Sequence, residues 1–315
     1  MLCIHLKNTN PFFCLAAEEY LLKNFTEDIF MLWQSDDTVV VGKHQNAMAE
    51  INYPFVRQNN ITVARRISGG GTVFHDSGNV NFSFIKNVSS PAEISFKLFT
   101  APVVEALDKL GVKATTSGRN DLLVDGLKVS GNAEHVFKNR VLHHGTLLFN
   151  SNLDTLGDAI RVKAGKYESK AVQSNRSHVA NISSYLPKQM SIEKFISFLI
   201  NVPAQKEGNR LYELRKDDIA TISELASEKF ITWDWCFGYS PKYTFRNEVE
   251  VDGRTVKVFL KVKKGIIENA NLEGNYFREP FTTEISALLV GKRHFFDDVK
   301  SVLSTDNKAL IYAFF

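Results

Sequence analysis

Hydrophobic and polar positions along the chain predict a mixture of helices and strands. Residues 15–23 have the apolar spacing of a helix. Residues 29–34 and 38–42 are typical of two buried strands joined by a Ser-Asp-Asp turn. Residues 47–59 are expected to be helical, with an interruption near Pro54, because proline removes a backbone donor.

The clearest amphipathic helix is predicted over residues 92–110, where apolar side chains form a broad face and Gly111 ends the segment. Asp125-Gly126, between two short apolar runs, predicts a β-hairpin. Because side chains alternate along a strand, Lys128 and Ser130 on the returning strand are expected to share one face.

The second half of the chain contains a basic segment without periodicity, residues 161–178, which is expected to be a mobile loop. Beyond residue 246 the apolar and polar positions alternate strongly, which predicts a small α+β unit. The chain is therefore expected to divide into a domain at 1–245 and an accessory domain at 246–315. The other elements expected are a strand at 141–150, helices near 191–201, 217–228, 281–291 and 295–304, a packed aromatic connector at 233–243, and hairpin turns at 252–253 and 264–265.

Composition fits an ordinary globular protein of 315 residues, 44% hydrophobic and 23% charged. The net charge of +3 gives no strong field, so neither nucleic acid nor a membrane is an expected partner. Three widely spaced cysteines favour a reducing compartment. With no secretory pattern at the start and no apolar run of about 20 residues, the expected location is cytoplasmic.

Three consecutive glycines, Gly69 to Gly71, carry the strongest chemical signal. A backbone without Cβ atoms can approach a ligand closely and present several N–H groups to it. Arg65 and Arg66 beside the loop supply forked donors suited to phosphate or carboxylate. A plain turn would need neither the arginines nor the nearby Ser68, so a ligand-binding loop is favoured.

Several nucleotide-binding motifs are absent from the sequence. There is no Gly-x-x-x-x-Gly-Lys-Ser/Thr motif and no Gly-x-Gly-x-x-Gly between a strand and a helix, and the glycine loop is expected to join two strands. An arginine, a lysine and an acid around such a loop suit chemistry at phosphorus, where charge neutralisation dominates. Asp121 could hold Mg²⁺. Lys128 taken alone is more typical of an exposed strand lysine, and His143 and His144 stay open between structural and functional roles.

Four blocks in this order resemble the lipoate–protein ligase family. They are Arg65-Arg-x-Ser-Gly-Gly-Gly-x-Val-x-His-Asp-x-Gly-Asn, Ser117-Gly-Arg-Asn-Asp-Leu, Lys128-Val-Ser-Gly-x-Ala and His143-His-Gly-Thr-Leu-Leu. The resemblance extends from Asp37-Thr-Val-Val-Val-Gly to Trp233-Asp-Trp-x-Phe-Gly and into the C-terminal unit. It implies an α/β (α+β) catalytic domain with a mixed sheet, related to biotin ligases and class II synthetase cores, plus a small α+β accessory domain.

The resemblance also implies the reaction and its partners. Lipoate and ATP, with Mg²⁺, would give lipoyl-AMP and pyrophosphate. The lipoyl group would then pass to a lysine of a lipoyl-carrier domain, either a 2-oxoacid dehydrogenase E2 subunit or the glycine cleavage H protein. The preferred carrier and the choice between lipoate and octanoate stay open.

Site residues are carried over from the family pattern. Lys128 falls at the catalytic lysine, contacting both lipoate and phosphate. The nucleotide-binding positions are Arg66, Gly71, Thr72, Val73, Phe74, Asn120 and Asp121, with Asp121 also at the metal. The lipoate-binding positions are Lys128, Arg66, His75, His144 and Trp33. An apolar slot for the lipoyl tail has Trp33, Val40, Phe82 and Phe84 as candidates, although each of them taken alone is more typical of plain core than of a slot lining.

Two alternative functions remain at this stage. An octanoyl- or lipoyl-transferase that needs no ATP would use a cysteine nucleophile, and no cysteine lies between Cys14 and Cys236. A non-catalytic lipoate- or nucleotide-binding protein would not need Lys128, Asn120 and Asp121 beside the glycine loop. The 161–178 loop could also close over the adenylate and exclude water, or be an ordinary solvated loop.

Overall fold

A mixed eight-stranded sheet is the centre of this computed structural model, which describes residues 1–90, 94–117, 120–175 and 177–315. The strand order is β12-β1-β2-β6-β10-β9-β8-β7, parallel where β1 meets β2 and β12 and antiparallel elsewhere. Its strands are β1 (Leu2–Leu6), β2 (Ile29–Trp33), β6 (Asn79–Asn87), β7 (Thr115–Ser117), β8 (Asp121–Val124), β9 (Leu127–Phe137), β10 (Arg140–Leu148) and β12 (Arg210–Leu211).

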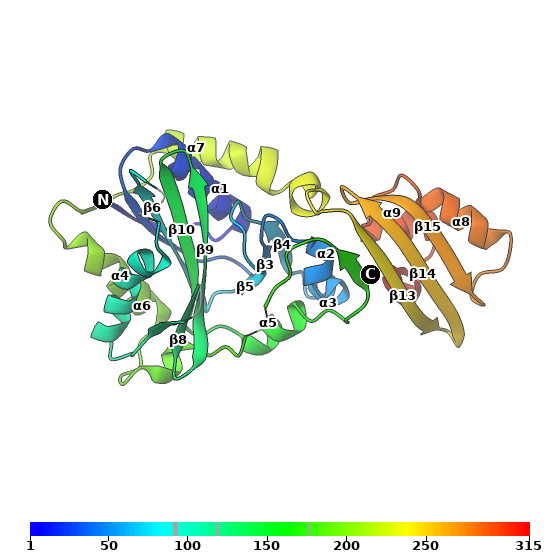
Figure 1. Ribbon diagram of the computed structural model, residues 1–315, viewed down its shortest axis with the longest axis horizontal. Helices are drawn as coiled ribbons and strands as arrows, with labels where there is room; N and C mark the ends of the chain where they lie inside the picture. The colour runs from blue at the N-terminus through cyan, green and yellow to red at the C-terminus, as the bar shows by residue number, and fades with distance from the viewer. Residues whose placement is uncertain (91–93, 118–119, 176) are drawn as a thin grey trace. The chain divides into compact units, whose positions relative to one another are not determined.

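Helices cover both faces of this sheet (Figure 1). Neighbouring residues of β10 show the two faces, because His143 stacks on Phe99 of α4 while His144 faces Glu18 of α1. The helices are α1 (Pro11–Asn24), α4 (Phe96–Lys109), α5 (Leu153–Ala159), α6 (Ile192–Ala204) and α7 (Lys216–Leu225), with shorter turns η2 (Ile182–Tyr185) and η3 (Ala226–Phe230). Both α4 and α6 contribute to one apolar core with the sheet.

A second, three-stranded sheet positions the glycine loop. Its order is β4-β3-β5, with β3 (Thr38–Val41) parallel to β4 (Thr62–Arg65) and antiparallel to β5 (Val73–His75). The glycine loop therefore joins two strands, as predicted. The two strands expected around the Ser-Asp-Asp turn are also present, but β2 and β3 belong to different sheets and do not pair.

The chain divides into two compact units. The first unit comprises residues 1–43, 62–157 and 175–231, and the second comprises residues 44–61, 158–174 and 232–315. Both units are therefore assembled from separate stretches of the sequence. The expected division into a domain at 1–245 and an accessory domain at 246–315 concerns function and remains a prediction. No helix among the described residues combines the length and apolarity needed to cross a membrane.

The second unit is built on a four-stranded antiparallel sheet of order β11-β13-β14-β15. Left-handed residues at Asp252-Gly253 and Lys264-Gly265 form the two predicted hairpin turns. Its strands are β11 (Tyr167–Ser169), β13 (Tyr243–Val251), β14 (Arg254–Lys263) and β15 (Ile266–Gly274), and its helices are α2 (Ala47–Glu50), α3 (Tyr53–Gln58), η4 (Asp234–Gly238), α8 (Phe281–Leu289), α9 (Phe296–Leu303) and α10 (Lys308–Tyr312).

The segment expected to be a mobile loop is anchored in the second unit. Residues 167–169 form β11 and pair with β13. The Lys166 ammonium donates to the carbonyl of Phe315 at 2.8 Å, and burial lowers the pKa of Lys166. Ser174 donates to Glu50 and accepts from Gln45 at 3.0 Å. The prediction of a loop is therefore wrong for residues 167–169, which form a strand, while Arg176 of the same segment lies outside the described residues.

Candidate active site

Three consecutive carbonyl groups of the glycine loop are turned toward the protein interior. The Arg66 guanidinium donates from Nη2 to the carbonyls of Gly69 at 2.6 Å and Gly71 at 2.7 Å. The carbonyl of Gly70 lies against Gly42, where an added Cβ would come within 2.2 Å of that oxygen. Gly70 itself has φ +86°, a conformation that favours glycine.

The orientation of these carbonyls fixes the direction of the neighbouring N–H groups. In a planar trans peptide the carbonyl and the following N–H point in opposite directions. The N–H groups of Gly70, Gly71 and Thr72 therefore point away from Arg66 and Gly42. Successive N–H groups with a common direction form a concave site for an anion, such as a phosphate.

Both arginines of the loop are held inside the protein. Arg66 also donates to Ser68 and to the carbonyl of Val40, and burial lowers the pKa of its guanidinium to about 10, so it stays charged at neutral pH. Arg65 donates to the carbonyls of Gly42 and Lys43. The sequence predicted that Arg66 lies at the nucleotide; the structure shows that most of its donors hold the loop itself.

A chain of hydrogen bonds links Arg66 to helix α1. Ser68 Oγ accepts from Arg66 Nε at 3.0 Å and is hydrogen-bonded to His144 Nε2 at 2.6 Å. His144 then donates from Nδ1 to the Glu18 carboxylate at 2.9 Å. This relay, Arg66–Ser68–His144–Glu18, connects a buried guanidinium to a buried carboxylate through a hydroxyl group and an imidazole.

The relay continues through Ser83 to Trp33. Ser83 Oγ donates to Glu18 at 2.6 Å and accepts from Trp33 Nε1 at 3.2 Å. Ser68, His144 and Glu18 have the order of a catalytic triad, but Ser68 is completely buried and already accepts a bond from Arg66. The group therefore positions the loop and does not supply a nucleophile.

His75 and Trp33 lie together beside this relay. Their rings meet edge to face with centroids 5.4 Å apart. Burial lowers the pKa of His75 to about 3, with Arg66 and His144 adding to the effect, so His75 is neutral. The next residue, Asp76, accepts from the backbone N–H groups of Gly78 and Asn152, which gives it a structural role at the end of β5.

Lys128 lies opposite the predicted acid on the β8–β9 hairpin. Its ammonium contacts the Asp121 carboxylate at 2.9 Å, and both side chains are partly exposed. The ladder shifts register between Leu122 and Leu123, so that β9 carries one extra residue at Val129. The expectation that Lys128 and Ser130 share a face is therefore wrong. Ser130 is completely buried, whereas the Lys128 ammonium lies over Gly131.

Gly131 leaves the space that this ammonium occupies. A Cβ at Gly131 would come within 3.0 Å of both Cε and Nζ of Lys128. The neighbouring Asn132 donates from its side chain and its backbone to the carbonyl of Asn120, at 2.8 and 3.0 Å. Asn120 is thus held by Asn132, and Asp121 lies against Lys128, while Gly118 and Arg119 of the same block lie outside the described residues.

Asp121 could supply one carboxylate to a magnesium ion. Mg²⁺ commonly takes one or two protein carboxylates and completes its shell with water and substrate phosphates. Within the described ranges no group of three or more His, Cys, Asp or Glu side chains is arranged around a metal position. A single carboxylate fits an ion that arrives with a nucleotide.

Other residues predicted for the site differ in their accessibility. Thr72 and Val73 are half-buried, whereas the side chain of Phe74 is buried, so it offers only its backbone. Phe82 and Phe84 belong to the core that packs against α4. Phe82 also stacks on His143, on the sheet face away from His144. These two aromatics are core, and Trp33 and Val40 are buried as well.

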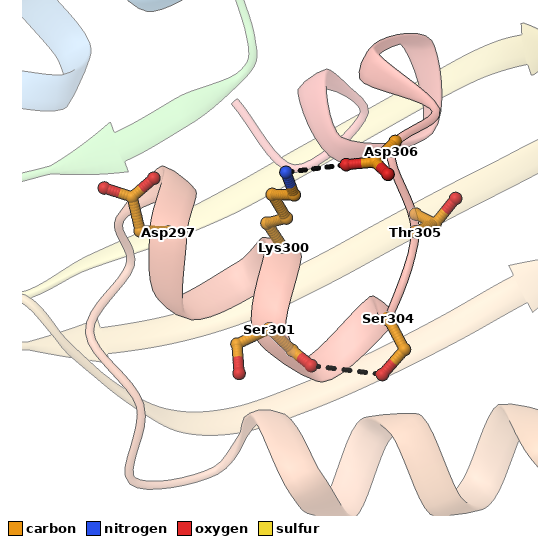
Figure 2. Close-up of a pocket in the computed structure, with 6 residues that line it drawn as sticks. All are labelled: Asp297, Lys300, Ser301, Ser304, Thr305 and Asp306. Atoms are coloured by element: carbon orange, nitrogen blue, oxygen red, sulfur yellow. Dashed lines mark hydrogen bonds and ion pairs between the residues drawn. The ribbon is translucent and has the colours of Figure 1, made fainter.

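A polar groove of about 420 Å³ lies elsewhere, on α9 of the second unit (Figure 2). An ion pair of 2.7 Å joins Lys300 and Asp306 across it. Hydroxyl groups of Ser301, Ser304 and Thr305 form the rest of the lining with Asp297. This lining contains no counterpart of the glycine loop with its aligned N–H groups.

Comparison with known families matches most of the chain. Residues 10–202 match the lipoyl protein ligase A/B catalytic domain, and residues 240–312 match the bacterial lipoate protein ligase C-terminus. A curated relative, lipoate-protein ligase LplJ of Bacillus subtilis, is 41% identical over 307 residues, which cover 93% of this chain and 91% of the relative.

Two solved structures are similar in fold. One is a bipartite lipoate protein ligase studied with its E2 lipoyl domain from Thermoplasma acidophilum, with a TM-score of 0.65 and 24% identity over 75% of this chain and 95% of that chain. The other is lipoate-protein ligase A bound with ATP, with a TM-score of 0.65 and 24% identity over 76% of this chain and all (100%) of that chain. Both likenesses support the α/β architecture described above.

Proposed function

Because the chain belongs to the lipoate–protein ligase family, we propose that it activates lipoate with ATP to lipoyl-AMP and then transfers the lipoyl group to a lysine of an acceptor protein. It is an enzyme of protein lipoylation. The observation that carries the proposal is the glycine loop with its N–H groups turned outward, together with Lys128 on strand β9. The ATP-bound ligase of similar fold supports ATP as the co-substrate.

In the first step, the lipoate carboxylate attacks the α-phosphate of ATP. A carboxylate with a pKa of about 4 to 5 is already ionised at neutral pH, so this step needs no general base. Its difficulty is the repulsion between two anions. The Lys128 ammonium, after leaving Asp121, lies between them, and the N–H groups of the glycine loop hold the phosphates.

Asp121 is the residue that would hold Mg²⁺ with the triphosphate. The ion would neutralise charge on the departing pyrophosphate. Asp121 then has a second role in the protein itself, because its carboxylate keeps the Lys128 ammonium in place when no substrate is bound. Neutral His75 and Trp33 lie beside the relay and are proposed to contact lipoate, with His144 and Arg66.

In the second step, the acceptor lysine attacks the acyl-adenylate and releases AMP. An amine with a reference pKa of about 10.4 must lose a proton before it can attack. Positive charge around the site and partial desolvation would lower that pKa. The acceptor is proposed to be a lipoyl domain of a 2-oxoacid dehydrogenase E2 subunit or the glycine cleavage H protein, and the E2 lipoyl domain of the similar Thermoplasma system supports this class.

The proposed setting is the cytoplasm, where such carrier complexes and ATP occur together. We also propose that residues 1–245 carry both chemical steps and that residues 246–315 are accessory to them. The alternative of an ATP-independent transferase lacks its nucleophile, since Cys14 is buried and its pKa is raised well above the ordinary value by burial.

The test is pyrophosphate exchange into ATP in the presence of lipoate, repeated with octanoate. Exchange supports the ligase, whereas acyl transfer from a carrier without ATP would support the transferase. Lys128→Ala is expected to abolish exchange, because nothing else bridges the two anions, while circular dichroism and unfolding stay unchanged. Normal exchange by Lys128→Ala would overturn the role given to this lysine.

A further inference from the structure

Strand β9 continues beyond the strand that pairs with it on one side. Strand β8 pairs with β9 only as far as Asp121 opposite Gly131. On its other side, β9 pairs with β10 up to Phe137 opposite Arg140. Figure 1 shows β9 running beside β10 past the end of β8. The sheet therefore has an open edge along the last residues of β9.

The backbone groups at this edge can be identified from the strand pattern. Asn132 donates its backbone N–H toward the β8 side, to Asn120. Because alternate residues of a strand direct their N–H and C=O groups to the same side, those of Glu134 and Val136 point to that side too. Across the described part of the chain, no backbone group pairs with them. Such an edge is a template for another extended segment.

Lysines surround this edge. Lys23 and Lys138 place their ammonium groups 5.5 and 5.3 Å from the centre of the Phe137 ring. Burial lowers the pKa of His135, and the positive charges of Lys43 and Lys229 lower it further. Two carboxylates offset this charge: Glu19, which is shared between Lys23 and Lys229, and Glu134 of the edge itself, which lies 2.9 Å from His143 Nδ1. The four lysines outnumber them, so the charges named here sum to a positive value.

The same strand carries the catalytic lysine. Lys128 lies at the start of β9, and Gly131 lies under its ammonium. Further along the strand, Ala133 lies close to the glycine loop. A Cβ added to Gly70 would come within 3.6 Å of the Ala133 side chain. The open edge therefore begins where the site for the adenylate ends, and a segment paired with β9 would lead into that site.

We propose that this edge of β9 docks the acyl-accepting protein, through an extended, acidic segment that adds to the sheet beside Glu134 and Val136. This inference rests on the proposed ligase function, which requires a protein acceptor in the second step. Two backbone pairs fix the register of the segment, and the surrounding lysines favour acidic side chains. The pairing orients the acceptor so that its lysine approaches the acyl-adenylate.

The experiment separates the two half-reactions. Val136→Pro removes an outward N–H, which a strand edge tolerates because the β10 ladder does not use it. Lys138→Glu reverses a charge at the edge. Both variants are expected to keep pyrophosphate exchange within about twofold and to raise the KM for the apo lipoyl domain of an E2 subunit about tenfold, a loss of roughly 1.4 kcal/mol. Lys188→Glu, an equally exposed lysine before α6, is expected to change neither value.

Each outcome decides between distinct conclusions. The docking proposal would be overturned if Lys138→Glu retained exchange and had an unchanged KM for the lipoyl domain. If Val136→Pro fails to fold, Lys138→Glu alone tests the docking site. A wild-type dimer that Val136→Pro dissociates without altering that KM would instead assign the edge to a second copy of the chain. Absence of exchange in the wild type would contradict the proposed function itself.

Discussion

At the scale of single residues, the glycine loop is oriented by buried groups. Arg66 and Gly42 hold its carbonyls inward, and the relay through Ser68 and His144 ends on Glu18. The loop can therefore present its N–H groups before any ligand arrives. Preorganised donors need no rearrangement when charge appears on a phosphate.

Gly69 and Gly70 provide a matched pair of substitutions. An added Cβ at Gly69 meets no atom within 4 Å, whereas Gly70 has a left-handed φ and its Cβ would lie 3.0 Å from Arg66 Nη2. Gly69→Ala should leave the free energy of unfolding within about 0.5 kcal/mol but weaken ATP binding about tenfold. Gly70→Ala should lower stability by about 1 to 2 kcal/mol. Urea unfolding and calorimetric titration with an ATP analogue measure both, and unchanged affinity in Gly69→Ala would refute contact between nucleotide and loop.

Glu18 is expected to be the most sensitive member of the relay. Glu18→Ala leaves the donors of His144 and Ser83 buried without an acceptor, which should cost about 3 kcal/mol of stability. Ser83→Ala removes one neutral donor to Glu18 and leaves one neutral donor, Trp33 Nε1, without its acceptor, which should cost less, about 1 to 2 kcal/mol. Urea unfolding compares the two variants, and equal losses would argue against a central place for Glu18.

The sequence predicted only some of these residues. The glycine loop with its arginines stands out through its residue types, whereas the role of Lys128 comes only from the resemblance to the lipoate–protein ligase family. Glu18 gave no such signal, since a glutamate within an amphipathic segment is normally solvated. Its role depends on His144, which lies 126 positions away, and a contact at that separation leaves no local pattern.

At the scale of elements, the bulge in the β8–β9 hairpin decides where Lys128 points. The hairpin itself follows from Asp125-Gly126, both of which adopt a left-handed φ. The extra residue at Val129 then turns Lys128 toward Asp121 and Gly131. Regular alternation of side chains predicted that Lys128 lies on the same face as Ser130. This was wrong because sequence spacing alone does not reveal a bulge.

Gly131→Ala tests this arrangement. The new Cβ approaches the flexible end of Lys128, so the fold should tolerate it, but the ammonium must shift by a few tenths of an ångström. The kcat of pyrophosphate exchange should fall about tenfold, equivalent to about 1.4 kcal/mol in activation free energy. Gly157→Ala in α5, where nothing lies within 4 Å, is the control and should keep full exchange. Full activity in Gly131→Ala would show that the position of the ammonium is not critical.

Element types were predictable where the periodicity was long. The helix expected from residue 92 starts at Phe96 and ends within a residue of Leu110, although residues 92 and 93 lie outside the described ranges. Strands β2 and β3 were predicted, but an apolar run does not specify its partner, so their separation into two sheets was not. Strand β11 has three residues and no alternation, and it exists only through its pairing with β13.

At the scale of the whole molecule, each unit buries a neutral histidine. In the second unit, His294 donates from Nε2 to the carbonyl of Phe314 at 2.5 Å and accepts from Tyr243 at 2.7 Å. Burial lowers the pKa of His294 to about 4. In the first unit, burial lowers that of His75 to about 3. Both side chains are therefore uncharged in the folded protein at neutral pH.

These histidines predict a loss of stability in acid. Between the unfolded pKa of about 6.5 and the folded value, only the unfolded state binds the proton. The contribution of His294 is therefore complete above about pH 6.5 and is lost as the pH falls toward about 4, at up to about 1.4 kcal/mol per pH unit. Urea unfolding at pH 7.5 and 5.5 should show this decline, and His294→Gln should make it shallower. If the free energy of unfolding of His294→Gln fell equally steeply with pH, His294 would be excluded as a source of the acid sensitivity.

The three-part composition of the second unit has a consequence for synthesis on the ribosome. The first unit needs the chain only as far as residue 231, whereas the sheet that contains β11 also needs β13, β14 and β15. Proteins begin to fold from the N-terminal side while translation continues. Residues 44–61 and 158–174 must therefore emerge early and wait unpaired beside a largely folded neighbour, which makes them the stretch of the nascent polypeptide most in need of a chaperone.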